Sequence, residues 1–376
     1  MPKPSNKTSE NRVIYTKVFI IWLVCFVIFL IFLWSGPDMM RSITWTQPEN
    51  AYLLGEKFLN QGDLNNAYKK FVEAESVDVF PNEAHAHFVF GTVSEKLKHT
   101  DQAILEYEKS LELDGKNLPA DQALANLYAD AHQETKAVLM RDKVNLQMGQ
   151  QLMENKDFQK AADTFSKINH NSIYYPLSET EYALCLAKLG KTDLAIKELQ
   201  NITATDTTQL EAFQTLAELY QKKGLNSQAQ EIKKQIKELT PGIEVGQNLA
   251  NRVLFLGYDI STSQVKAGQS FDITYYWKCL TSFYENYIIG VQFYNSKDEI
   301  PFTNWHYPVN GTYPTTKWKP GEVIKEKYTV SVPANTLPDI YSIKISVCTI
   351  DKNATVVYKT IGNQKYTIGE IKVTAP

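Results

Sequence analysis

The stretch LGEKFLNQGDLNNAYKKFVEA, residues 54–74, combines small and large apolar residues in a pattern that returns along the chain as far as Gly242. Later copies place small residues at Gly91 and Ala103, Gly149 and Ala161, Ala183 and Ala195, and Ala217 and Ala229. Self-similarity at a spacing of about 34 residues is typical of stacked helix–turn–helix units. The pattern therefore predicts an α-solenoid over residues 47–242.

The small residues have a packing role in such a unit. We expect Gly55 and Gly149 to lie where the first helix of a pair is crossed closely, while Ala67 and Ala161 let the second helix approach. Large side chains such as Phe71 then fill the remaining space. These positions resemble the tetratricopeptide repeat family, and the resemblance covers about half of the chain.

One repeat departs from the regular spacing. Residues 135–155 contain no proline and only one glycine, Gly149, so they predict a single long helix. A repeat in this region is therefore expected to be truncated or fused with the next one.

The composition limits the function classes. A chain of 376 residues predicts about two or three domains. A net charge of -3 offers no surplus of basic surface for nucleic acid. The cysteines contain no CxxC pair, which argues against zinc knuckles and thioredoxin-like chemistry; they are Cys25, Cys185, Cys279 and Cys348. A disulfide between Cys279 and Cys348 and two buried free thiols both remain open.

The N-terminal region predicts a membrane anchor. Residues 1–17 form a basic tail, and an uninterrupted apolar run begins at Val18 and ends at Trp34. We expect a transmembrane helix over residues 18–36; a cleaved signal peptide is the alternative, but the run is longer than a typical apolar region of that kind. The basic flank predicts a cytoplasmic N-terminus, with the bulk of this single-pass protein extracytoplasmic.

The first helix of each repeat lines the concave face of a solenoid, and extended concave surfaces suit extended protein partners. The residues that we expect there, as a candidate partner groove, are Tyr52, Glu56, Phe88, Thr92, Glu95, Gln214 and Glu218. The alternative is that they form an ordinary solvated helical surface.

From residue 244 to residue 376 the apolar period changes to two. Phe271, Ile273, Tyr275 and Trp277 alternate with polar residues, and turn residues separate this run from several similar ones. Many short strands of this kind predict an antiparallel β-sandwich. The segment from Asn310 to Glu322 resembles a β-sandwich appended to some bacterial glycosyltransferase-like envelope proteins, which implies a setting near glycan assembly.

An aromatic cluster in this region allows two interpretations. Trp305, Tyr307, Tyr313 and Trp318 form a candidate glycan surface, because exposed rings stack on the apolar faces of sugars. Alternatively, the tryptophans fill the core of the sandwich, as aromatic residues commonly do. We favour the core for Trp318.

The motifs of catalysis and cofactor binding are missing from the sequence. It has no GxGxxG, GxxxxGK[ST], HExxH or GxSxG. His85 and His87 are two residues apart on a helix and face different directions, so no metal site is expected there. We therefore predict no catalytic residues, no cofactor and no metal.

The sequence thus supports two hypotheses of different classes. The first is a membrane-anchored extracytoplasmic scaffold that binds other envelope or membrane proteins through the repeat groove. The second is a glycan-binding or polysaccharide-assembly accessory protein that uses the β-sandwich. A third hypothesis, an enzyme, is not supported by any set of candidate catalytic residues in the sequence.

Overall fold

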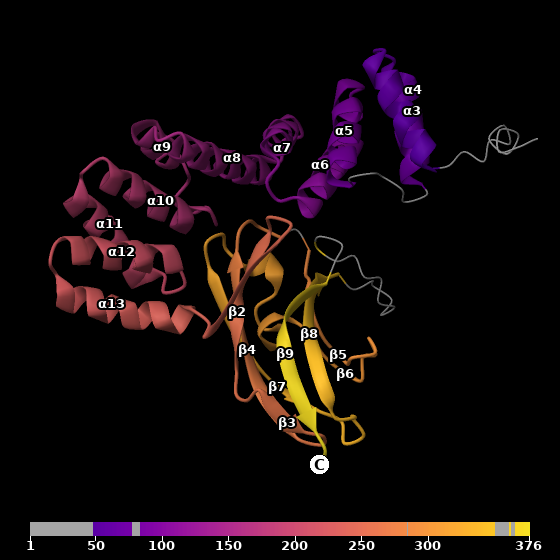
Figure 1. Cartoon of the computed structure of the whole chain (residues 1–376). Helices are drawn as coiled ribbons and strands as arrows, with labels where there is room; N and C mark the ends of the chain where they lie inside the picture. Colours follow the sequence, from indigo (N-terminus) through magenta and orange to yellow (C-terminus); the bar gives the residue numbers. More distant parts are fainter. Residues whose placement is uncertain (1–47, 77–82, 284, 350–360, 362–364) are drawn as a thin grey trace, which may run out of the picture.

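The structure is a computed structural model that describes residues 48–76, 83–283, 285–349, 361 and 365–376. Its first part is a series of helices that pack as antiparallel pairs (Figure 1). The helices are α3 (Pro48–Asn60), α4 (Leu64–Glu75), α5 (Glu83–Lys96), α6 (Thr100–Leu113), α7 (Leu118–Asp130), α8 (Glu134–Glu154), α9 (Phe158–Phe165), α10 (Tyr175–Lys188), α11 (Thr192–Thr205), α12 (Leu210–Lys222) and α13 (Asn226–Leu239).

The turn inside each helix pair contains a residue in the left-handed region of backbone space. Glycine takes this position at Gly62, Gly190 and Gly224, with φ of 78°, 78° and 75°. Lysine or histidine takes it at Lys98, His132 and Lys156, with φ of 64°, 56° and 62°. Successive turns lie 34–36 residues apart, except that Lys156 follows His132 after only 24.

The short interval identifies the fused repeat that the sequence predicts. α8 is one continuous helix of 21 residues. Its first half pairs with α7 and its second half pairs with α9, so it serves two repeats without a loop between them (Figure 1).

The predicted packing of small against large residues is confirmed. A Cβ atom on Gly55 would lie 2.6 Å from the Phe71 ring, and one on Gly149 would lie 2.4 Å from the Phe165 ring. No carbon contact is that short, so a side chain at either position would force the two helices apart.

The second part of the chain forms two β-sheets. Their strands are β1 (Ile243–Leu249), β2 (Val253–Ile260), β3 (Gln264–Lys266), β4 (Ser270–Cys279), β5 (Ile288–Tyr294), β6 (Phe302–His306), β7 (Val323–Ser331), β8 (Asp339–Cys348) and β9 (Tyr366–Thr374), with short 3-10 helices η1 (Pro308–Gly311) and η2 (Thr315–Lys317). One sheet has the order β1-β2-β4-β7, and the other has the order β3-β9-β8-β5-β6.

The alternation predicted for residues 271–277 is confirmed, because its apolar members all enter one core shared by both sheets. They meet Ile289 and Val291 from β5, among other residues. The sheets are antiparallel apart from β3, which pairs with β9 in parallel. The fold class is therefore helical repeats followed by a β-sandwich that is antiparallel except at this one edge.

The membrane part of the predicted fold class needs correction. The expected anchor over residues 18–36 lies outside the described residues, as does Cys25. Within the described ranges, no helix is both long enough and apolar enough to cross a bilayer. A transmembrane helix is accordingly removed from the fold class, and the single-pass membrane localisation that depended on it is withdrawn.

Candidate functional site

The predicted groove residues fall into two separate groups. Tyr52, Glu56, Phe88, Thr92 and Glu95 lie on α3 and α5, whereas Gln214 and Glu218 lie on α12. Figure 1 shows these helices at opposite ends of the solenoid. The structure thus gathers the first group and leaves the α12 residues apart from it, exposed to solvent.

One of these assignments has to be corrected. Tyr52 is only 3% exposed, and its ring packs 5.5 Å from that of Phe71 in the core of the first repeat. It cannot serve as an exposed anchor for a partner. Phe88 is half-buried, with its ring 5.7 Å from that of Tyr107, so one side of it remains accessible.

A recurring pair of residues organises the polar side chains in this part of the solenoid. Buried tyrosines donate hydrogen bonds to half-buried glutamates: Tyr52 to Glu56 at 3.0 Å, Tyr107 to Glu95 at 2.7 Å, and Tyr128 to Glu108. Burial, and then the nearby carboxylate, raises the pKa of Tyr52 and of Tyr128. Each hydroxyl therefore keeps its proton and holds a carboxylate in one orientation. The sequence does not reveal these pairs, because only the first lies within one helix.

The groove face is thus pre-ordered rather than freely solvated. Thr92 is held as well: its hydroxyl donates to the Phe88 carbonyl at 2.9 Å and lies 3.3 Å from the Tyr107 hydroxyl. Side chains that are already ordered lose less conformational entropy when a partner binds. Glu56 and Glu95 lie on α3 and α5, and we call the surface that they form with Phe88 and Thr92 the α3–α7 face.

A buried ionic cluster ties the first two repeats together. His87 Nδ1 lies 2.6 Å from Glu106 Oε2, and Lys109 contacts both Glu106, at 3.2 Å, and Glu75. Burial opposes the charge on Glu106, but His87 and Lys109 outweigh it and lower the pKa of this carboxyl. The ligand atoms of Glu75, His87 and Glu106 lie within 4.8 Å of one another. The Lys109 ammonium already supplies the positive charge there, so the cluster is a structural ion pair between repeats.

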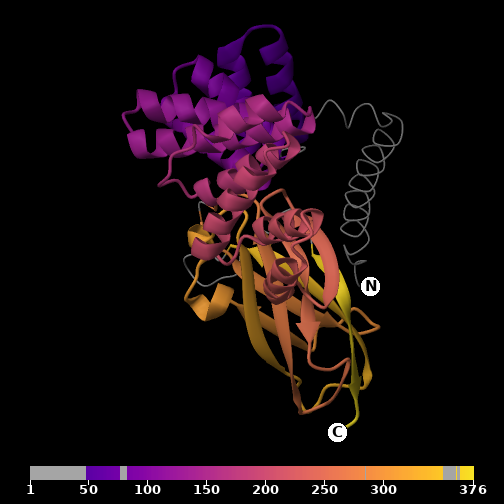
Figure 2. The ribbon, with the colours of Figure 1, turned by 90° about the vertical axis from the view of Figure 1, so that its left-hand side faces the viewer.

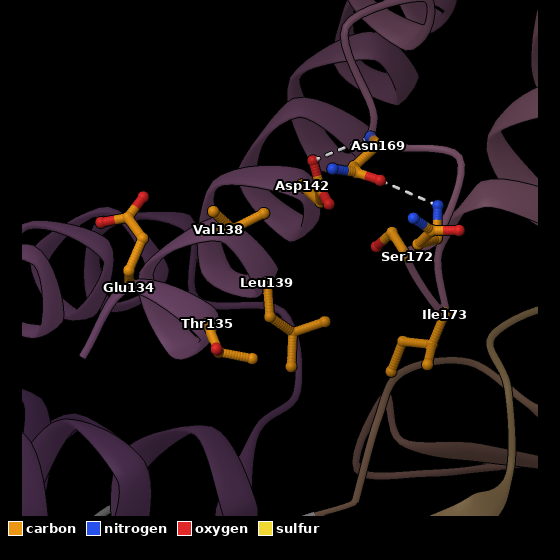
Figure 3. A pocket seen from close by; sticks show the side chains of 9 residues that line it. Glu134, Thr135, Val138, Leu139, Asp142, Asn169, Ser172 and Ile173 are labelled. Carbon is orange, nitrogen blue, oxygen red and sulfur yellow. Dashed lines mark hydrogen bonds between the residues drawn. The ribbon is translucent and has the colours of Figure 1, made fainter.

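Two pockets open on α8. The first, of about 350 Å³, lies between the first half of α8 and the loop from α9 to α10 (Figure 3). Its lining combines carboxylates, amides, hydroxyls and an apolar floor: Glu134, Thr135, Val138, Leu139, Asp142, Asn169, Asn171, Ser172 and Ile173. The second, of about 360 Å³, lies between α7 and α8 and is lined by Gln122, Ala125, Asn126, Arg141, Val144 and Asn145.

The β-sandwich docks along the loops that join successive repeats (Figures 1 and 2). Gly115 N–H donates to Ala250 O at 3.1 Å, and Val323 N–H donates to Thr208 O at 3.0 Å. The Tyr174 and Ser282 hydroxyls lie 2.8 Å apart. Bonds of this kind fix the relative position of the two parts, while α3 to α5 extend away from the sandwich (Figure 1).

A buried arginine lies at the centre of this junction. Arg252 is 0% exposed, and its guanidinium donates to Leu111 O at 2.7 Å and to Ser282 O at 2.9 Å. The same group lies 4.7 Å from the centre of the Phe283 ring. Arg252 therefore joins the end of α6 to two segments of the sandwich.

Acidic side chains crowd a second part of the junction. Lys278 of β4 forms an ion pair with Glu211 of α12, and Gln150 donates to Glu181 of α10 at 3.3 Å. Burial, followed by repulsion from Glu211, raises the pKa of Glu181 to about 7. Glu181 thus holds a proton in the folded protein over a pH range in which an unfolded glutamate has lost it.

This raised pKa predicts a pH-dependent stability. Between pH 4.5, the ordinary pKa of a glutamate, and about pH 7, the folded state keeps a proton that the unfolded state loses. The contribution to stability is therefore full below pH 4.5 and is lost as the pH rises through 7. Glu181→Gln removes this loss. We expect the variant to match the wild type near pH 4.5 and to exceed it by about 1–3 kcal/mol at pH 8 in urea unfolding. Equal differences at both pH values would contradict the assignment.

The four candidate glycan residues do not share one surface. Trp318 is 2% exposed and packs edge-on against Phe283, so it belongs to the core. Tyr307 is 54% exposed, whereas Tyr313 is half-buried and donates to Glu322 at 2.9 Å. Trp305 lies against Gly290 of β5 and is half-buried. Cys279 and Cys348 are buried free thiols, so they form no disulfide.

Comparison with known proteins identifies the repeat type. A model of the tetratricopeptide repeat family matches residues 84–117, which comprise α5, α6 and the turn before α7. A search of curated proteins found no sequence that matches the chain.

Solved structures provide weaker likenesses. A tetratricopeptide repeat protein from Parabacteroides merdae is 18% identical, covers 51% of this chain and 79% of its own, and has a TM-score of 0.27. YrrB, a TPR protein with an unusual peptide-binding site, is 19% identical over 45% of this chain and 91% of its own, with a TM-score of 0.27. MamA is 18% identical, covers 51% of this chain and 90% of its own, and has a TM-score of 0.23. The family model therefore identifies a tetratricopeptide repeat at residues 84–117, and the other helix pairs have the same helix–turn–helix arrangement.

Proposed function

We propose that this tetratricopeptide repeat protein is a non-enzymatic scaffold that binds a protein segment carrying lysine or arginine on its α3–α7 face. The repeat fold itself supports a role in protein–protein interaction. The observation that carries the finer proposal is the pair of tyrosine-held carboxylates on this face, Glu56 and Glu95. Fixed negative charges favour basic partners and speed their encounter with the protein.

Phe88 gives the same face an apolar contact. Its half-buried ring lies 5.7 Å from that of Tyr107, on the same helix as Thr92 and Glu95. Aromatic residues with one side exposed are the usual anchors of protein interfaces. A basic segment with one apolar residue therefore suits this face better than a purely charged one.

The other finer predictions are not part of this proposal. The envelope setting of the partner depended on the membrane anchor, which has been withdrawn from the fold class. The glycan role required one surface formed by Trp305, Tyr307, Tyr313 and Trp318, and Trp318 lies in the core instead.

Photo-crosslinking in cells tests the proposed face. With p-benzoylphenylalanine in place of Phe88, we expect a discrete protein adduct, and with the same group at Lys69, which is exposed on α4, we expect none. Adding Glu95→Gln should lower the adduct yield about tenfold, because the loss of one charge-assisted contact costs about 1.4 kcal/mol or more. Higher salt should lower it too.

The comparison with Lys69 shows whether the adducts are specific to the α3–α7 face. Equal adducts from both positions, or a yield at position 88 that is insensitive to both Glu95→Gln and salt, would rule out the α3–α7 face as an electrostatic docking surface. The fold should be preserved in these variants, since Phe88 and Glu95 are half-buried at the surface.

A further inference from the structure

The pocket between α8 and the α9–α10 loop contains a buried carboxylate with incomplete partners. Asp142 is 4% exposed and lines the pocket. One of its oxygens, Oδ1, accepts a hydrogen bond from Asn169 N–H at 3.2 Å (Figure 3). The other oxygen, Oδ2, has no hydrogen bond of acceptable geometry among the described residues.

The charges around Asp142 do not compensate for its burial. Burial raises the pKa of this carboxyl; the Asn169 amide, the Ser172 hydroxyl and, last, the Arg141 charge act in the opposite direction without cancelling it. Arg141 itself forms an ion pair with Glu134, the other carboxylate of the pocket. A buried carboxylate without its own cation is costly, and a cation that arrives beside it recovers part of that cost.

The other residues that line the pocket indicate which kind of ligand it can hold. Val138, Leu139 and Ile173 provide apolar contacts, while Asn169 and Ser172 lie at the side of Asp142 (Figure 3). Methylene groups pack on apolar side chains while a charged head reaches a polar wall. A volume of about 350 Å³ can hold a side chain of that kind.

We propose that this pocket binds a primary alkylammonium group, with the methylene stem on Val138, Leu139 and Ile173 and the ammonium beside Asp142. Ammonium fits better than guanidinium, because Asn169 already occupies one carboxylate oxygen and only one is left. A guanidinium gains its advantage from binding two oxygens at once. Oδ2 is covered in the unliganded protein, so a rotation of a lining side chain admits the ammonium.

The group can come from a lysine side chain of a protein or from a free diamine. Titration of the full chain with N-acetyl-lysine methylamide, with cadaverine and with the norleucine analogue separates these sources. The readout is the set of backbone amide signals of Asn169 and Ser172 in a nitrogen-15 correlation spectrum. We expect lysine to shift both signals and norleucine, which has the stem without the charge, to leave them unchanged. Stronger shifts by cadaverine than by lysine identify a small amine as the ligand.

Charge variants complete the test. Asp142→Asn keeps the acceptor for Asn169 and removes the charge, so we expect lysine to bind at least about tenfold more weakly. Its melting temperature should not fall, since a neutral side chain is easier to bury. Glu154→Gln, at the exposed end of α8 and outside the pocket lining, removes the same charge elsewhere on this helix and should leave binding nearly unchanged. Unchanged binding by Asp142→Asn, equal shifts by norleucine, or no shift by any amine would overturn the proposal. The α3–α7 face does not depend on this result.

Discussion

Arg252→Met should destabilise the protein by about 2–6 kcal/mol, because two buried carbonyls lose their hydrogen-bond donor. The arginine is fully buried and donates to Leu111 O and Ser282 O, and methionine of similar volume can donate to neither. Each buried carbonyl then loses its partner, at about 1–3 kcal/mol. Urea unfolding of the full chain, followed by circular dichroism at 222 nm, measures the loss.

A matched control lies at the same junction. Lys325 contacts Glu238 at 3.5 Å, but both side chains are largely exposed. Lys325→Met should therefore change stability by less than about 0.5 kcal/mol. Equal midpoints for the Arg252 variant and the wild type would show that the solenoid and the sandwich do not need this arginine to stay together.

Trp318→Ala should cost about 3–5 kcal/mol, as expected when a large aromatic side chain is removed from a core. Its ring lies 5.8 Å from that of Phe283, and its indole N–H donates to Tyr313 O at 3.1 Å. The substitution leaves a cavity and an unpaired carbonyl together. The urea midpoint of the variant gives the size of the effect.

Tyr307→Ala is the control for the rival interpretation of the aromatic cluster. Tyr307 is 54% exposed, so its removal should change stability by less than about 0.5 kcal/mol. If Trp318→Ala melted like the wild type as well, the ring would not be a core residue and the assignment of a glycan surface would have to be reconsidered.

The repeats could be predicted because their packing depends on residue size. Gly55 and Phe71 must fit together wherever two helices cross closely, and that requirement is visible in the sequence. The turns could be predicted only in part. A glycine such as Gly62 indicates a left-handed turn residue, whereas Lys98 and His132 adopt the same conformation without a sequence signal.

The candidate sites were harder to predict, because they depend on contacts between distant residues. Tyr52 follows the pattern of a groove residue, but the local packing of the first repeat places its ring in the core. Arg252 looks like an ordinary turn residue, and its partner Leu111 lies 141 positions earlier. Asp142 lies on a helix, and only the loop from α9 to α10 turns it into the wall of a pocket. No periodicity or motif records such contacts.

The continuity of α8 has a mechanical consequence. In a solenoid of separate hairpins, each interhelical loop can absorb a small displacement, so neighbouring repeats bend independently. α8 has no such loop over its 21 residues, a rod of about 30 Å at 1.5 Å per residue. Asp142 lies in its first half and Gly149 in its second. A tilt of α8 at the pocket therefore also tilts its second half, which packs against α9, because no loop separates the two halves.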